Sequence, residues 1–213
     1  MKKLILILTF FSHFIFASEL QEAINKAPEG SKITLAQGEY LGNIVINKPL
    51  TLDGVDKKAK IVGDGNGSVI TIKSSNVVIK NLSIENSGFS VENVDSAIYA
   101  KDVNNITIQS NHMSDSLFGI NLEQVNRSKV IDNFITSKDL ELGIRGDAIR
   151  LWNSHDNQLL SNKIYKSRDF VLWYSSGNNI ENNYGSYNRY SLHFMHAGRN
   201  MVRNNFFEYN SVG

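Results

Sequence analysis

The recurring segments Ile106–Asn111 (ITIQSN), Val130–Asn133 (VIDN) and Leu159–Asn162 (LLSN) decide the fold. Each combines apolar and polar residues in alternation and ends in an asparagine, and the same ending recurs along the chain. Successive final asparagines are 30, 22, 29, 21 and 22 residues apart, and they are Asn81, Asn111, Asn133, Asn162, Asn183 and Asn205. A unit of about 22 residues with short strands cannot bury its apolar face alone, whereas stacked units form a continuous core.

A second column of apolar residues keeps the same period. Its spacings are 22, 29, 22 and 21, and its members are Ile98, Ile120, Ile149, Val171 and Leu192. The two longer repeats place their extra residues at Ser87–Asp95 and Ser137–Gly146, where the alternation lapses. Leucine-rich repeats have a similar length, but their Leu-x-x-Leu-x-Leu signature is missing. The pattern therefore predicts an all-β fold, a right-handed parallel β-helix of the pectin-lyase-like type.

The predicted coil has different features at its two ends. Residues 19–27 carry Leu20, Ala23, Ile24 and Ala27 at helical spacing, so we expect a short helix that covers the first coil and its strand edge. At the other end the chain stops at Ser211-Val212-Gly213, where another coil should begin. No capping segment is visible there, and we expect a β-helix truncated at its C-terminus.

The first residues have the layout of a secretory signal peptide. A cationic start, Met1-Lys2-Lys3, precedes the apolar stretch Leu4–Phe16 and the small pair Ala17-Ser18. This largely apolar stretch is 13 residues long, shorter than the roughly 20 residues that span a bilayer. We therefore expect a signal peptide at residues 1–17, a β-helix domain at 18–213, and a periplasmic location.

Composition limits the chemistry of any site. The chain has no cysteine, so a metal would have to be held by histidine, methionine, carboxylate or backbone groups. The formal net charge is +1, with charged residues spread along the chain, which argues against a nucleic-acid partner.

The second column predicts which side chains share the outer surface of the coil. If Ile149, Val171 and Leu192 stack facing inward, the strand period of two sends the next residues outward. The outward positions are then Arg150, Leu172 and His193, followed by Trp152, Tyr174 and Met195. His193 and Met195 share a face, and His196 follows in the turn. Imidazole and thioether ligands suit Cu(I), so His193, Met195 and His196 are the candidate metal ligands.

Two other interpretations concern the same surface. Arg150, Trp152 and Tyr174 have the composition of a protein-docking patch, although exposed aromatic residues also line sugar-binding grooves. Asp147 and Asp169 are expected to stack near several arginines, where they could serve a polysaccharide lyase or simply form compensated charge pairs.

Three segments in sequence resemble the NosD family. They are Gly146–Trp152 (GDAIRLW), Arg168–Asn178 (RDFVLWYSSGN) and Arg189–Met195 (RYSLHFM). The resemblance implies a periplasmic β-helical protein that helps to mature the copper sites of nitrous oxide reductase. It implies copper as transiently bound cargo and no catalysis by this chain. The implied partners are an ABC transporter permease and its ATPase, a copper chaperone lipoprotein and the apo-reductase.

Two other functions remain open on this fold. One is a polysaccharide lyase or epimerase acting on uronate polymers, and the other is a purely structural or adhesive solenoid. Fold alone does not choose among them, because the chemistry lies in the site.

Overall fold

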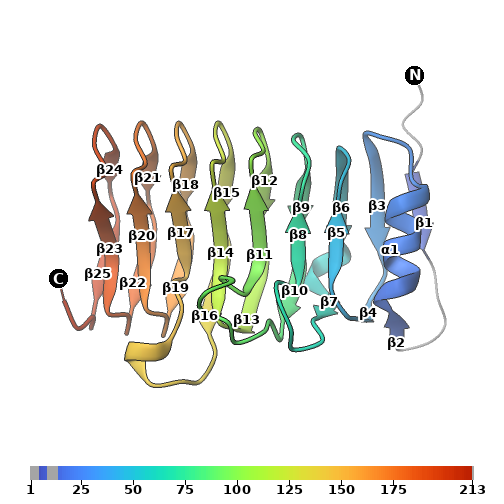
Figure 1. Cartoon of the computed structure of the whole chain (residues 1–213), viewed down its shortest axis with the longest axis horizontal. Coiled ribbons are helices and arrows are strands. Elements are labelled where there is room, and N and C mark those ends of the chain that lie inside the picture. Colours follow the sequence, from blue (N-terminus) through green and yellow to red (C-terminus); the bar gives the residue numbers. More distant parts are fainter. Residues whose placement is uncertain (1–4, 9–13, 213) are drawn as a thin grey trace.

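A computed structural model shows a parallel β-helix whose coils are stacked along the long axis of the molecule (Figure 1). The structure describes residues 5–8 and 14–212. Three parallel sheets run the length of the stack, and each complete coil contributes one strand to each sheet. The predicted fold class is confirmed.

The first and second sheets each have nine strands within the described ranges. The first contains β1 (Ile5–Leu8), β3 (Ser31–Leu35), β6 (Leu50–Gly54), β9 (Val78–Lys80), β12 (Thr107–Gln109), β15 (Lys129–Ile131), β18 (Gln158–Leu160), β21 (Asn179–Glu181) and β24 (Met201–Arg203). The second contains β2 (Phe14–Phe16), β4 (Gly38–Leu41), β7 (Ala59–Val62), β10 (Leu82–Glu85), β13 (His112–Ser116), β16 (Phe134–Ser137), β19 (Lys163–Tyr165), β22 (Tyr184–Ser186) and β25 (Phe206–Glu208).

The third sheet has seven strands and carries the surface that matters for function. They are β5 (Ile44–Ile46), β8 (Ile70–Ile72), β11 (Ser96–Lys101), β14 (Phe118–Glu123), β17 (Ile149–Trp152), β20 (Asp169–Trp173) and β23 (Tyr190–Met195). Short 3-10 turns occur at η1 (Val55–Lys57) and η2 (Leu142–Ile144). The turn η2 lies within the second long repeat, whose loop protrudes in yellow at one edge of the coil (Figure 1).

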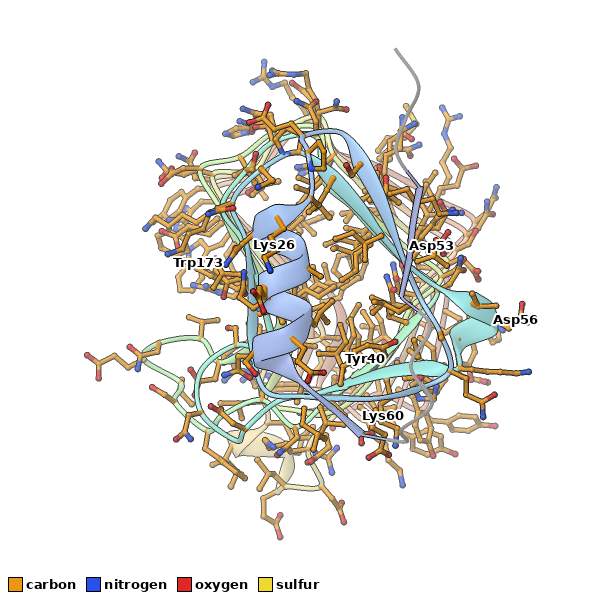
Figure 2. All side chains as sticks on the ribbon, turned by 90° about the vertical axis from the view of Figure 1, so that its right-hand side faces the viewer. Lys26, Tyr40, Asp53, Asp56, Lys60 and Trp173 are labelled. Carbon is orange, nitrogen blue, oxygen red and sulfur yellow. The ribbon has the colours of Figure 1, made fainter. Side chains whose placement is uncertain are left out.

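The helix α1 (Ala17–Lys26) lies across the first coil, as Figure 2 shows in a view along the axis. Two residues of this helix, Leu20 and Ile24, are fully buried against the coil. The Gln21 side chain also forms two hydrogen bonds with the edge strand β5. Gln21 Nε2 donates to Val45 O at 2.9 Å, and Val45 N donates to Gln21 Oε1 at 2.7 Å. The helix thus satisfies backbone groups that an open sheet edge would leave unpaired.

Asparagine ladders join the coils at their corners. At the corner between the first and second sheets, each amide Nδ2 donates to the next amide Oδ1 at 2.9–3.1 Å, through Asn111, Asn133, Asn162, Asn183 and Asn205. A second ladder joins Asn157, Asn178 and Asn200. These side chains satisfy buried backbone groups that no strand pairing reaches.

One member of the expected asparagine column was placed wrongly. Leu82, not Asn81, occupies the ladder position, since Leu82 N donates to Asn111 Oδ1. Asn81 has a φ of 56° and matches Ser110 in the next coil, which has a φ of 54°. The left-handed conformation therefore belongs to the residue before each ladder asparagine.

The predicted signal peptide is only partly described: Ile5–Leu8 and Phe14–Phe16 form β1 and β2, which pair with β3 and β4. Residues 1–4 and 9–13 are not among those the structure describes, so the predicted signal peptide at 1–17 stays a prediction. No helix in the described part of the chain combines the length and apolar character that a membrane crossing requires.

Candidate metal and docking surface on the third sheet

The register of the third sheet differs from the expected one at β20. Ile149 pairs with Phe170 and Leu151 with Leu172, so Val171 does not lie over Ile149. A further irregularity follows in β23, where Val171 pairs with His193. The predicted stack of Ile149, Val171 and Leu192 is therefore wrong. It is displaced by one residue between β17 and β20, and by one more between β20 and β23, where the pairing is irregular.

The corrected register changes which side chains face outward. Leu172, predicted to be exposed, is fully buried in the core. Trp173, predicted to be core, pairs with Trp152 on one side and Met195 on the other, and it projects from the outside of the wall (Figure 2). Tyr174 is not in the outward row but follows the strand with a φ of 50°.

His193 and Met195 lie two residues apart on β23, with the outward residues Val171 and Trp173 as their neighbours in β20. The period of two therefore places both side chains on the same face. This placement survives the change in register because it depends on β23 alone.

A carboxylate orients the His193 ring. His193 Nδ1 lies 3.2 Å from Asp169 Oδ2, and the ring stacks on Tyr190 with 4.6 Å between centroids. Burial acts to raise the pKa of Asp169, but hydrogen bonds from Arg189 and His193 outweigh it and hold that pKa below its ordinary value. An ionised carboxylate only accepts hydrogen bonds, so Asp169 pairs with an N–H at His193 Nδ1 and leaves Nε2 as the ring nitrogen available to a ligand.

His196 does not join the other two candidate ligands. Its ring stacks on Tyr174, with 5.1 Å between centroids and 6° between planes. His196 is exposed and has a φ of 50°, equivalent to Tyr174 one coil earlier. The structure thus brings His193 and Met195 to one face and directs His196 toward Tyr174.

The described residues contain no cluster of three or more histidine, cysteine or carboxylate side chains that could hold a metal ion. The adjacent residues His112 and Met113 do not form a second soft-ligand pair, because Met113 is fully buried and the exposed His112 ring packs against Phe134.

The predicted docking residues gather around two tryptophans. The guanidinium carbon of Arg150 lies 5.3 Å from the Trp152 ring centroid and 5.8 Å from that of Trp173. Tyr174 meets Trp152 edge to face at 5.5 Å. Arg150, Trp152 and Tyr174 therefore share one surface with Trp173, which we call the aromatic patch.

The two aspartates considered for a lyase are buried and paired. Asp147 is bound by Arg168 at 2.9 Å, and Asp169 by Arg189 at 2.5 Å. Burial raises the pKa of Asp147, and its ion pair with Arg168 only partly opposes that effect. Both carboxylates are almost fully covered, so the arrangement matches compensated charge pairs.

Sequence reasoning missed three members of this surface. Asp169 was considered for a lyase and not as the partner of His193, although the 24 residues between them are one coil plus two positions. Asn121 lies opposite Arg150 in the register, and Trp173 was assigned to the core. The predicted pairing of Ile120 with Ile149 was correct and already implied the place of Asn121, whereas Trp173 could be found only with the corrected register of β20.

Comparisons with known proteins agree with the sequence resemblance. A family model described as "Periplasmic copper-binding protein (NosD)" matches residues 138–213. A Pseudomonas aeruginosa protein named "Probable ABC transporter binding protein NosD" is 29% identical over 146 residues, which are 68% of this chain and 34% of the relative. The Stutzerimonas stutzeri protein of the same name is 28% identical over 148 residues, 67% of this chain and 33% of the relative. The chain spans about a third of the length of these curated relatives.

Solved structures show the fold. An alginate lyase from a Paenibacillus species has a TM-score of 0.69 at 15% identity and covers 93% of this chain, with 74% of its own chain matched. The rice weevil pectin methyl esterase has a TM-score of 0.54 at 14% identity, over 84% of this chain and 62% of its own. At such low identity these enzymes inform the architecture and not the activity. The family model covers the segment that carries His193 and Met195, so this chain is a parallel β-helix that is similar to NosD proteins, most directly over residues 138–213.

Proposed function

We propose that this chain is a periplasmic accessory protein that receives and hands on Cu(I) during the maturation of nitrous oxide reductase. One observation carries the proposal. His193, oriented by Asp169, presents Nε2 on the same face of β23 as the Met195 thioether.

The chemistry of these two ligands suits a transferable cuprous ion. Thioether sulfur and imidazole are soft or intermediate donors that favour Cu(I) over hard cations. A carboxylate on Nδ1 fixes the tautomer and raises the basicity of Nε2, as such partners do for metal-bound histidines. Two protein ligands leave coordination positions free, which a donor or acceptor protein can fill during transfer.

The proposed partners come from the family. The family description names a periplasmic copper-binding protein, and the curated relatives are named as ABC transporter binding proteins. We propose the same setting here, with an ABC permease and ATPase, a copper chaperone lipoprotein and the apo-reductase as partners. Residues 1–17 would be removed on export, so the exported protein should begin at Ser18 by N-terminal mass analysis.

A polysaccharide lyase or epimerase remains the alternative function. The burial and pairing of Asp147 and Asp169 speak against it, because a lyase needs acids that reach a polymer. Unsaturated products from uronate polymers, seen as rising ultraviolet absorbance, would support this alternative and contradict the non-enzymatic role.

The test of copper binding is a Cu(I) titration of the purified protein against a chromophoric chelator. Replacing the ligands in His193→Ala and Met195→Leu should each weaken Cu(I) binding at least about tenfold, and Asp169→Asn should weaken it by roughly 10- to 100-fold. The matched controls are His196→Ala and Met201→Leu, whose side chains lie away from the proposed site, and both should keep the parent affinity. Unchanged affinity in both His193→Ala and Met195→Leu would show that this site is not the ligand set.

A further inference from the structure

Arg150 is a half-buried cation without a salt bridge in the described part of the chain. Its one hydrogen bond runs from Nη1 to Asn121 Oδ1 at 3.2 Å. Burial lowers the pKa of Arg150, although the charges of Asp147 and Glu123 partly oppose this effect. A guanidinium offers five N–H donors, so most of its binding capacity is unused.

The acids near Arg150 are already neutralised by other groups. Glu123 accepts from the Lys101 ammonium at 2.6 Å and from the Tyr99 hydroxyl at 2.9 Å. Asp147 is bound by Arg168. Arg150 therefore contributes one uncompensated positive charge to the aromatic patch.

Two further donors beside Arg150 lack acceptors. Asn121 Nδ2 and Trp173 Nε1 are buried and have no hydrogen-bond partner among the described residues. The bond from Arg150 to Asn121 Oδ1 fixes the orientation of that amide, so its NH2 group is the unpaired one. A buried donor without a partner costs about 1–3 kcal/mol, so the packing next to Arg150 is strained on its polar side.

We propose that the aromatic patch binds a carboxylate side chain from an acidic segment of a partner protein. This inference rests on the proposed function, which requires partner proteins, and it names the chemistry of one contact with such a partner. A carboxylate matches the planar fork of Arg150, whose other N–H groups have no acceptor among the described residues. Arginine, tryptophan and tyrosine are also the residues enriched at the centres of protein interfaces.

The aromatic rings favour a protein partner over a sugar polymer. A sugar stacks on a free aromatic face, whereas the Trp152 ring lies beside Arg150 and the Tyr174 ring is stacked against His196. The rings of Trp152 and Trp173 thus lie beside the Arg150 guanidinium and do not offer a free face to a sugar.

The chain contains two tryptophans, and both lie in this patch, so their indole N–H signals in an NMR spectrum report on it directly. Trp152→Phe assigns the two signals. Hexaglutamate added to the purified protein should shift the Trp173 signal in a saturable way, and hexaglutamine should not. Arg150→Gln should weaken this binding roughly tenfold or more, because a charge-assisted hydrogen bond is lost. Arg150→Lys, which keeps the charge but not the fork, should also weaken it, and the exposed control Arg203→Gln should not.

Each outcome decides for or against the inference. Two results would overturn the inference. One is the absence of a hexaglutamate shift in the parent protein, and the other is binding of hexaglutamate by correctly folded Arg150→Gln and Arg150→Lys with the parent affinity. A shift with hexagalacturonate but not with hexaglutamate would overturn the protein partner and point to an acidic sugar. Arg150 is not a proposed copper ligand, so Arg150→Gln should keep its Cu(I) affinity, and failure of the copper proposal would be seen separately.

Discussion

The corner between the first and second sheets and the outer surface of the third sheet arise from the same repeat but follow it differently. At the corner, asparagine amides from Asn111 to Asn205 bond coil to coil without interruption. On the third sheet the pairing of β20 with β23 is irregular, and unpaired donors lie beside Arg150. In the regular region the side-chain amides bond to one another, whereas in the irregular region the Arg150 guanidinium keeps N–H groups that can bind a ligand.

Asn162→Ala should have the largest effect, because it breaks the regular region. The Asn162 side chain accepts from the backbone N–H and the amide of Asn133, and it donates to Val130 O and Asn183 Oδ1. Its loss leaves several buried groups unsatisfied, so the free energy of unfolding should fall by about 3 kcal/mol or more. Urea denaturation measures this change. The exposed control Asn93→Ala should stay near the parent, and similar losses in both variants would contradict a structural role for the ladder.

The two buried aspartates of the irregular region should differ in their dependence on pH. The folded-state pKa of Asp169 is lowered, so its contribution to stability is present above its ordinary pKa and is lost as the pH falls through the folded value. The pKa of Asp147 is raised, so its contribution has the opposite sign and stability is lost as the pH rises through that window.

Asp169→Asn should therefore cost about 2 kcal/mol at pH 7 through weakened charge-assisted hydrogen bonds, and Asp147→Asn should cost less. Unfolding curves at pH 7 and at pH values below the ordinary aspartate range would measure both. The cost of Asp169→Asn should shrink on acidification. Equal costs for the two variants at pH 7 would refute the distinction between these carboxylates.

The two long repeats are held together by one buried lysine, which gives a test of intermediate size. Lys138 Nζ lies 3.0 Å from Asp115 O and 4.3 Å from the ring centroid of Phe89, which belongs to the other long repeat. Lys138→Met keeps the apolar stem but removes the charge, so it should cost about 1–2 kcal/mol and speed cleavage of both loops in limited proteolysis. The exposed variant Lys129→Met is the control, and unchanged cleavage would show that the loops are held independently.

His196→Ala should have the smallest effect on stability. It removes the stack on Tyr174, which is worth about 0.5–1 kcal/mol at an exposed site. Thermal unfolding should show a shift of that size or less. A larger loss would mean that the turn at His196 supports more of the patch than this contact.

The sequence was sufficient for the architecture but not for the register of the functional surface. The asparagine period predicted the coils, and Leu20 and Ile24 predicted the covering helix. Phe170-Val171-Leu172-Trp173 is a continuous apolar run, so alternation could not tell which members face inward. The irregular pairing of β23 adds a shift that only the backbone hydrogen bonds reveal. His193 and Met195 were placed together because their relation is local to one strand.

The asparagine ladder has a direction. Each amide–amide bond in it runs from Nδ2 of one asparagine to Oδ1 of its C-terminal neighbour, so the side-chain dipoles add head to tail and polarise one another. Losing an amide at either extremity only shortens the row, whereas losing a central one divides it into two weaker rows. The same substitution should therefore be tolerated unequally along the axis, even though every rung looks alike.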